Sequence, residues 1–176
     1  MTQDMVKLIE PIVPALRRYA RALLKDRSAA DDLVQDCLER AIEHWHQRRK
    51  DGNPRAWIFA ILHNLAMSRL RRSGRTPTHV ALDDAHNESL SVAARQEDHL
   101  QYRDLLHAID LLPEDQRTVL LLVTVEDLSY ADTAQALNIP IGTVMSRLSR
   151  ARERLLKLMS GDAQPQSDHP HLRSVK

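Results

Sequence analysis

Residues 129–155 read SYADTAQALNIPIGTVMSRLSRARERL. Ser129 begins this stretch as a helix N-cap, with Asp132 as its capping-box partner. The segment NIPIG then interrupts the chain with a proline and a glycine. From Thr143 to about Met159, apolar side chains recur at spacings of four and three on one helical face: Val144, Leu148, Ala151, Leu155 and Leu158. The pattern predicts a short capped helix, a turn and an amphipathic helix.

The exposed side of this second helix is polar and basic near its N-terminal end. Its stripe consists of Thr143, Ser146, Arg147 and Arg150. In a helix-turn-helix, side chains at this position meet base edges in the major groove of DNA. Arginine pairs with guanine or with phosphate, and hydroxyl groups suit phosphate or either base type. A solvated face on an ordinary three-helix bundle is the alternative, and charge alone does not separate the two. The turn together with the stripe favours DNA.

The composition of the whole chain also predicts an all-α protein. Its 176 residues include two Trp, three Tyr, one Phe and four Gly, too few for a β-sandwich or barrel. The single cysteine, Cys37, cannot form an internal disulfide, which fits a reducing compartment. The longest apolar run, residues 118–125, is far shorter than the roughly 20 residues of a spanning helix. The first residues, MTQDMVKLIEP, lack a signal-peptide pattern. We therefore expect a soluble, cytoplasmic protein without membrane insertion.

The formal net charge of +1 conceals a strong segregation of charge. Residues 1–72 hold 14 basic and 9 acidic side chains, residues 101–142 hold 2 and 7, and residues 143–157 hold 5 and 1. A protein that binds a polyanion with its whole surface would be basic throughout. Two basic islands separated by acidic sequence instead predict two footprints on one long polyanion.

Helical patterns lie on both sides of a segment without periodicity. The expected N-terminal helices are one within 5–24, one that begins with a capping box at Ser28 and Asp31, and one from Asn53-Pro54 to about Arg72. From Ser73 to about Gln96 the sequence is typical of a linker. The expected organisation is two small helical domains with a linker and a tail: domains at 1–72 and 99–160, a flexible linker at 73–98 and a disordered tail at 161–176.

One predicted helical face in the N-terminal part is acidic. Four carboxylates follow one another at spacings of four, three and four, with a glutamine beside them: Asp32, Asp36, Glu39, Glu43 and Gln35. Such a row repels DNA, so in a nucleic-acid-binding protein it predicts a basic protein partner; a merely solvated face is the alternative. Acid-base catalysis is not expected, because an exposed helical face has no desolvating pocket that shifts a pKa.

The segment 44–72 is basic, with seven basic residues and one acidic. The cations that can follow a phosphate backbone are Arg48, Arg49, Lys50, Arg55, Arg69, Arg71 and Arg72. One helical face combines an aromatic ring, an amide, a hydroxyl and a cation: Trp57, Asn64, Ser68 and Arg71. These groups suit an unstacked base, which needs stacking, edge hydrogen bonds and charge neutralisation. A Trp on an amphipathic helix is more often a core residue, so Trp57 is the weak member.

No pattern in the chain indicates a metal site, a cofactor or an enzyme. His44 and His46 share no helical face, and His169 and His171 lie in the expected tail. Cys37 falls on the buried face of its helix. The chain has neither a phosphate-binding glycine loop nor a recognisable Ser-His-Asp arrangement. We expect no enzymatic activity, no cofactor and no bound metal.

Three segments resemble, in family order, the bacterial RNA polymerase sigma factors of the extracytoplasmic-function (ECF) subfamily. LPEDQRTVLLLVTVEDLSYADTAQALNIPIGTVMSRLSRARERL (112–155) resembles region 4, whereas AADDLVQDCLERA (29–41) and NPRAWIFAILHNLAMSRLRR (53–72) resemble region 2. The sequence departs from the family at Met145, where many relatives carry Lys or Arg, and at Ser68, where an acidic residue is common. The Met145 departure removes one contact that relatives could make with phosphate or base.

The resemblance implies a two-domain initiation factor that binds core RNA polymerase, recognises the minus-35 promoter element with region 4 and melts the minus-10 element with region 2. It implies that the acidic row docks on the clamp helices of the polymerase β′ subunit and that the C-terminal domain meets the β flap. In the family, the loop that corresponds to 46–55 captures a flipped base, and the asparagine that matches Asn64 lies near it. Family members are commonly held inactive by an anti-sigma factor.

Two other classes of protein remain as alternatives at this point. A free-standing helix-turn-helix regulator would need an apolar sensor pocket or a symmetric seam in its N-terminal half, where the sequence instead places an acidic row beside a basic surface. A helical adaptor that binds only proteins would not explain the two basic islands. The sigma-factor interpretation accounts for all three surfaces.

Overall fold

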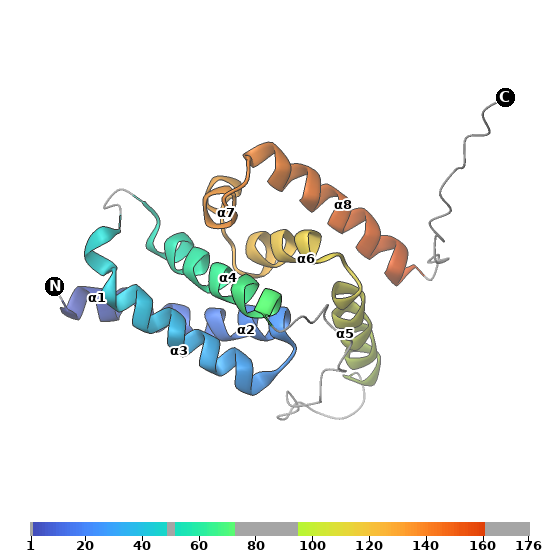
Figure 1. The fold of residues 1–176 in the computed structure, drawn as a ribbon. Helices are drawn as coiled ribbons and strands as arrows, with labels where there is room; N and C mark the ends of the chain where they lie inside the picture. Colours follow the sequence, from blue (N-terminus) through green and yellow to red (C-terminus); the bar gives the residue numbers. More distant parts are fainter. Residues whose placement is uncertain (1, 49–51, 73–94, 161–176) are drawn as a thin grey trace.

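The structure, a computed structural model, describes residues 2–48, 52–72 and 95–160. The N-terminal half contains α1 (Thr2–Ile9), η1 (Glu10–Ile12), α2 (Val13–Leu24), α3 (Arg27–Glu43), η2 (Trp45–Gln47) and α4 (Pro54–Arg72). The C-terminal half contains α5 (Arg95–Asp110), α6 (Glu114–Leu120), η3 (Leu121–Val125), α7 (Tyr130–Leu137) and α8 (Ile141–Met159) (Figure 1). No strand occurs in these three ranges, and the all-α prediction is confirmed.

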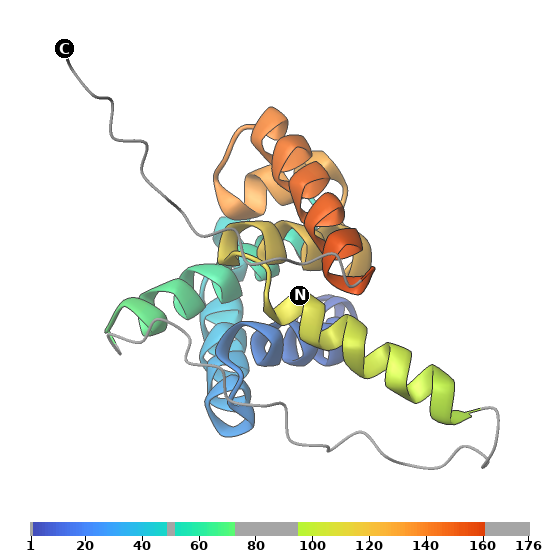
Figure 2. The same cartoon turned by 90° about the vertical axis from the view of Figure 1, so that its right-hand side faces the viewer.

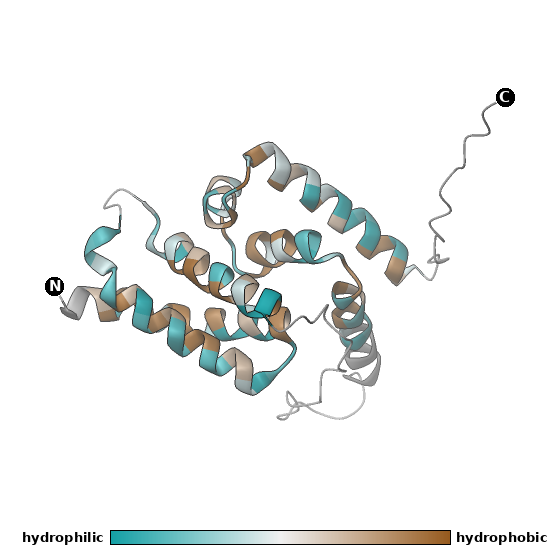
Figure 3. Ribbon diagram, viewed as in Figure 1, coloured by the Kyte–Doolittle hydropathy of each residue, from teal (hydrophilic) through white to brown (hydrophobic). Residues whose placement is uncertain are grey.

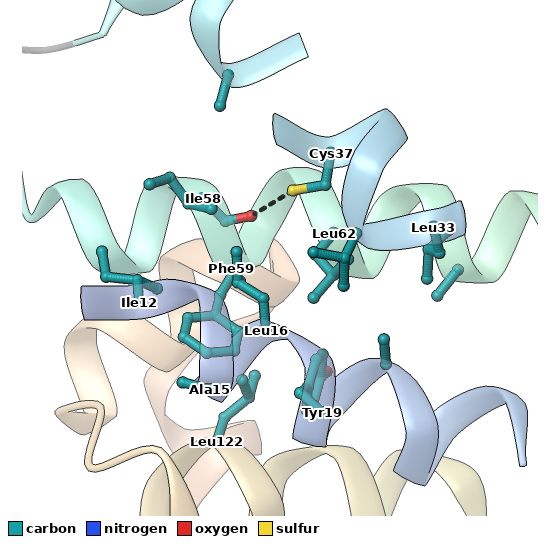
Figure 4. Packing of buried hydrophobic residues seen from close by; sticks show 14 of the residues in the cluster. Ile12, Ala15, Leu16, Tyr19, Leu33, Cys37, Ile58, Phe59, Leu62 and Leu122 are labelled. Carbon is teal, nitrogen blue, oxygen red and sulfur yellow. Dashed lines mark hydrogen bonds between the residues drawn. The ribbon is translucent and has the colours of Figure 1, made fainter. Parts of the chain in front are cut away.

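The N-terminal half is a bundle in which α2, α3 and α4 pack against one another. Prolines at the second positions of η1 and α2, Pro11 and Pro14, divide the expected 5–24 helix into α1, a 3-10 turn and α2, because proline has no backbone N–H to donate inside a helix. The bundle core includes Leu16, Leu33 and Leu62, all without exposed surface or nearly so. Cys37 is fully buried, as predicted, and its thiol donates to the Ile58 carbonyl oxygen at 3.6 Å (Figure 4).

The predicted cap of the second helix at Ser28 is wrong. Lys25 ends α2 in the left-handed conformation (φ 55°), and Asp26 follows with extended backbone. The Asp26 carboxylate accepts a hydrogen bond from the Ala29 amide at 2.9 Å, so the helix begins earlier than the serine suggests. Ser28 therefore lies inside the first turn of α3.

The caps predicted for α4 and α7 are confirmed. The Asn53 side-chain oxygen accepts from the Arg55 amide at 3.0 Å, and the Ser129 hydroxyl oxygen accepts from the Asp132 amide at 3.0 Å. The turn between α7 and α8 depends on Asn138, which has φ 52° and ψ 48°. The glycine that the sequence analysis associated with this turn, Gly142, instead lies in the first turn of α8. Asparagine tolerates the left-handed conformation better than other non-glycine residues, so a glycine is not needed at the turn.

The two halves share a hydrophobic core, which the division into separate domains did not anticipate. Leu121, Leu122 and Leu128, which belong to the C-terminal half, join the buried cluster of the N-terminal bundle. Figure 4 shows Leu122 beside Ala15 and Leu16. In both ribbon views α6 lies between α8 and the N-terminal helices (Figures 1 and 2), and α4 packs against α7.

A second cluster holds the helix-turn-helix together. It consists of Leu112, Val119, Leu120, Val144, Leu148 and Ala151. The apolar face predicted for α8 supplies three of these residues, while its more C-terminal members, Leu155 and Leu158, are only partly buried. Between the two clusters, η3 is a π-helical turn. The extra residue of a π turn rotates the chain that follows, and that chain contains the buried Glu126.

Candidate nucleic-acid interface

The acidic row predicted to meet a protein partner lies on the exposed face of α3. All five of its residues are exposed: Asp32, Gln35, Asp36, Glu39 and Glu43. The Gln35 side-chain amide donates to the Glu39 carboxylate at 3.1 Å. A long ion pair of 3.8 Å joins Asp36 to Arg69, and because both side chains are solvated it is weak. In Figure 3, hydrophilic residues alternate with hydrophobic ones along the α3 ribbon.

The loop before α4 packs an arginine on an aromatic pair. The Arg48 guanidinium lies 4.8 Å from the centre of the Trp45 ring and donates to the Gly52 carbonyl oxygen at 3.4 Å. The Trp45 and Trp57 rings meet edge to face, with their centres 6.0 Å apart. Trp57 packs against the bundle core, which agrees with its interpretation as a core residue. The predictions for Arg49 and Lys50 lie outside the described residues.

The predicted base-holding face of α4 presents its polar groups on one side of the helix. Asn64, Arg71 and Arg72 are exposed. Ser68 is half-buried, and its hydroxyl oxygen accepts a hydrogen bond from Arg71 at 3.4 Å. The spacing of these residues thus places an amide, a hydroxyl and two cations within one surface.

Arg55, another predicted phosphate contact, is engaged within the chain. Its guanidinium lies 5.5 Å from the Phe59 ring centre and donates to the Glu126 carboxylate at 3.1 Å. Arg18 of α2 donates to the same carboxylate oxygen, also at 3.1 Å. Burial raises the pKa of Glu126, and the two arginines oppose that shift. Sequence reasoning missed Arg18 and Glu126, because no local pattern relates residues so far apart in the chain.

The predicted stripe on α8 is divided between solvent and the neighbouring helix. Ser146 and Arg150 are exposed, and the Arg150 guanidinium donates to the Ser146 hydroxyl at 3.3 Å. Thr143 is half-buried, and its carbonyl oxygen accepts from the Ser146 hydroxyl at 3.1 Å. Arg147 turns toward α6, where its Nε lies 3.2 Å from an Asp115 carboxylate oxygen. Of the four predicted stripe residues, therefore, only Ser146 and Arg150 are exposed, and Arg147 is paired with α6.

Polar contacts and a cleft also join the two halves. Asn53 donates to the Asp132 carboxylate at 2.9 Å, and Lys25 forms a 3.2 Å ion pair with Asp110. A cleft of ≈ 410 Å³ is lined by His63, Met67, Glu114, Asp115, Thr118, Leu137 and Arg147. Burial lowers the pKa of His63 to about 4, and the Tyr19 hydroxyl hydrogen-bonds its Nδ1 at 3.1 Å. The His63 ring is therefore neutral at physiological pH.

Within 2–48, 52–72 and 95–160, no helix is both long and apolar enough to cross a membrane. The same ranges contain no group of three or more His, Cys, Asp or Glu side chains placed to hold a metal ion.

This geometry defines a helical protein in two parts, with a helix-turn-helix in the C-terminal part and an exposed acidic helical face in the N-terminal part. Residues 9–63 match the family described as "Sigma2 domain of PhyR", and residues 102–155 match "Sigma-70, region 4". The chain is 37% identical over 150 residues to the ECF RNA polymerase sigma factor EcfG of Rhodopseudomonas palustris (strain TIE-1), covering 85% of this chain and 82% of that protein. The chain belongs to the ECF RNA polymerase sigma factors.

Further relatives and a solved structure agree with this assignment. The RNA polymerase sigma factor HrpL of Pseudomonas syringae pv. syringae is 31% identical over 147 residues, covering 81% of this chain and 80% of that protein. The structure of the sigma factor RpoE from Bartonella quintana, in complex with the anti-sigma factor NepR, matches with a TM-score of 0.74 and 32% identity. That match covers 92% of this chain and 99% of the other. As a member of this family, the chain is a factor for promoter-directed transcription initiation.

Proposed function

We propose that this chain directs core RNA polymerase to promoters in the cytoplasm, reading the minus-35 element with α8 and melting the minus-10 element with α4 and the loop before it. It does so without chemistry of its own. One observation carries the proposal: a single chain holds two separate basic surfaces and, on a third helix, an exposed acidic face. A DNA-binding regulator needs the first two, whereas a polymerase subunit needs all three.

The acidic face of α3 is the proposed contact with core polymerase. A row of exposed carboxylates attracts a basic protein surface and repels DNA, so it suits the β′ clamp helices implied by the family. The C-terminal half would meet the β flap. An anti-sigma factor is a third proposed partner, because the RpoE structure that this chain resembles is a complex with one.

We propose that the two basic surfaces bind different parts of promoter DNA. We assign the phosphate backbone near minus-10 to Arg48, Arg49, Lys50, Arg55, Arg71 and Arg72, and the unstacked base to Asn64 and Ser68. On α8, Arg150 is proposed to read a base. Arg147, which is anchored to Asp115, is proposed to position the helix together with Ser146 and Thr143. Phosphate contacts fix the register of the protein, and base contacts supply the specificity.

Run-off transcription with and without core polymerase tests the function. We expect transcripts from a cognate promoter only when this chain and core polymerase are both present. With the wild-type chain we also expect permanganate-reactive thymines around minus-10. Asn64→Ala should reduce permanganate reactivity much more than closed-complex binding, because the base contact forms only after melting. Nanomolar, sequence-specific binding by the chain alone, with no run-off product, would instead identify a free-standing helix-turn-helix regulator.

A further inference from the structure

Two arginines of the N-terminal half converge on one anionic oxygen of the C-terminal half. A terminal guanidinium nitrogen of Arg18 and one of Arg55 each lie 3.1 Å from the same oxygen of Glu126. The Glu126 side chain is 1% exposed, whereas those of Arg18 and Arg55 are 56% and 33% exposed. The two arginines therefore form a pair of cations that is partly exposed to solvent. The buried Glu126 carboxylate of the other half binds both of them on their buried side.

The carboxylate leaves part of the arginine hydrogen-bonding capacity unused. Each guanidinium contacts Glu126 through one terminal nitrogen. The Nε of Arg55 is buried and has no hydrogen-bond partner among the residues that the structure describes. A guanidinium offers a planar fork of donors that matches two oxygens of a phosphate or carboxylate at once. The contact with Glu126 does not use that fork.

Two other contacts between the halves also join a donor of the N-terminal half to a carboxylate of the C-terminal half. Asn53, beside the basic loop, binds the Asp132 carboxylate, and Lys25 binds that of Asp110. The acidic partners come from residues 101–142, which hold 7 acidic and 2 basic side chains, and the donors come from residues 1–72, which hold 14 basic and 9 acidic. The acidic segment thus supplies the carboxylates in each of these contacts.

We propose that Arg18 and Arg55 form a binding site for a phosphate of the nucleic-acid backbone, and that Glu126 occupies this site in place of the phosphate while the two halves are packed together. The inference rests on the proposed function and deepens it. It adds Arg18 to the DNA-binding surface and makes Glu126 an internal competitor of promoter DNA.

Physical differences between the two anions favour the exchange once DNA is near. Glu126 is buried, and that burial raises its pKa, so its charge is held in the interface at a desolvation cost. A backbone phosphate stays partly hydrated and presents two oxygens to a guanidinium fork. Leaving the site also returns Glu126 to water.

The test is the salt dependence of binding by the full-length chain to a short fluorescent poly(dT) oligonucleotide, measured by anisotropy. Each phosphate contact with single-stranded DNA contributes about 0.7 to the slope of log K against log salt concentration. Arg18→Ala should lower the slope by about 0.7 and weaken binding several-fold. Glu126→Gln should strengthen binding several-fold and steepen the slope by a similar amount, because it frees one positive charge.

Neighbouring residues provide matched controls. Arg17 lies on the same helix, is also 56% exposed, and pairs with Asp31 at 3.8 Å, away from Glu126. Asp127 is exposed and has φ 53°, which an asparagine tolerates. Arg17→Ala and Asp127→Asn should each change the affinity less than Arg18→Ala and Glu126→Gln do. In the double variant, Arg18→Ala should remove most of the gain that Glu126→Gln provides.

Any of three outcomes would overturn the phosphate site. Arg18→Ala and Arg17→Ala could change the affinity for poly(dT) equally, or Glu126→Gln could bind no more tightly than Asp127→Asn. The third outcome is no measurable binding at low salt by either the wild type or Glu126→Gln. If Glu126→Gln fails to fold by circular dichroism, the comparison of Arg18→Ala with Arg17→Ala still decides, since Arg18 is exposed. If the chain gives run-off transcripts but the variants lack these effects, only the proposed phosphate site is overturned. If the variants show these effects but the chain gives no run-off transcripts, only the sigma function is overturned.

Discussion

The acidic face of α3 and the basic surface around α4 differ in how much of each the chain itself occupies. The α3 carboxylates are exposed, and the one pairing that joins their row to another helix in the described structure is the long Asp36–Arg69 contact. On the basic side, Arg55 is paired with Glu126 and Asn53 with Asp132. The surface proposed for protein docking is therefore exposed in the isolated chain. Part of the surface proposed for DNA is paired with carboxylates of the C-terminal half, and these contacts must break before DNA can bind there.

The charge of the C-terminal half explains this difference. Residues 101–142 are acidic, so they can neutralise a basic surface and would be repelled by the α3 row. The proposal for Arg18 and Arg55 therefore predicts that DNA must compete with Glu126 for basic groups, whereas a partner of α3 would meet carboxylates that are already exposed.

Charge reversal on the α3 row should have a strong effect on docking. Reversing Asp36 and Glu39 to Lys should abolish co-elution with core polymerase at moderate salt, because like charges placed opposite each other cost several kcal/mol. The fold should persist, since both side chains are exposed and the Asp36–Arg69 ion pair is worth about 1 kcal/mol or less. Size-exclusion chromatography of the mixture measures the association.

A control with the same change of charge separates docking from general electrostatics. Glu10 and Asp104 are exposed and lie outside the row, so the double reversal Glu10→Lys with Asp104→Lys should retain association. Equal loss in both double variants would show that net charge matters and the α3 row does not.

The next effect tests whether the halves form one folding unit. Leu148 is buried in the C-terminal cluster, and its replacement by Ala should cost about 2–5 kcal/mol. Both tryptophans, Trp45 and Trp57, lie in the N-terminal half. Because the halves share a core, Leu148→Ala should lower the denaturation midpoint seen by tryptophan fluorescence as well as that seen by circular dichroism.

Leu33, buried within the N-terminal bundle, provides the matched variant. Leu33→Ala should also shift both signals together. A Leu148→Ala protein whose fluorescence midpoint stays at the wild-type value would mean that the halves unfold separately. The contacts between the halves would then be too weak to keep the basic surface internally paired.

The sequence predicted most of the elements but not their association. Helical periodicity and the caps at Asn53 and Ser129 are local signals, and they place α4 and α7 correctly. The cap at Ser28 failed because Asp26, two residues earlier, offers an equally good acceptor, and local preference cannot rank the two. The exposed α3 row followed from spacing alone, since residues on one helical face share their environment.

The contacts between the halves needed the structure. Glu126 and Arg18 are separated by 108 positions, so no periodicity or motif relates them. Leu122 looked like one member of an apolar run, and nothing in that run distinguishes a residue of its own domain core from one buried against another. The pairing of Arg147 with Asp115 is of the same kind, because the rotation of α8 against α6 depends on tertiary packing.

A smaller effect concerns the two arginines of α8. Arg150→Ala should cost about 1–3 kcal/mol and relax the preference at one base pair of the minus-35 element, whereas Arg147→Ala should weaken all sequences alike and lower the salt slope. The structure sharpens the distinction, since Arg147 is paired with Asp115 and Arg150 is exposed. Reconstituted holoenzyme tested against a minus-35 library measures both. An unchanged base preference in Arg150→Ala would contradict its assignment.

Acidification should weaken the packing between the halves slightly. Burial lowers the pKa of His63 to about 4, below the value of about 6.5 for an unperturbed histidine, so the folded state disfavours the protonated ring. The stability that His63 contributes is complete above pH 6.5 and is lost as the pH falls toward 4, by about 1 kcal/mol at pH 5.5.

The groups around His63 determine how this effect is isolated. Tyr19 of α2, Glu114 and Asp115 of α6 and Arg147 of α8 lie near it, and Glu126, with its raised pKa, stabilises the packed state on acidification. All of these remain in His63→Gln, which keeps a hydrogen-bonding group for the Tyr19 hydroxyl. Thermal unfolding between pH 7.5 and pH 5.5 should therefore show a smaller loss of Tm in His63→Gln than in the wild type. Parallel losses would mean that the ring is accessible to protons and that the cleft opens readily, which would weaken the contrast between a ready docking face and an internally paired DNA surface.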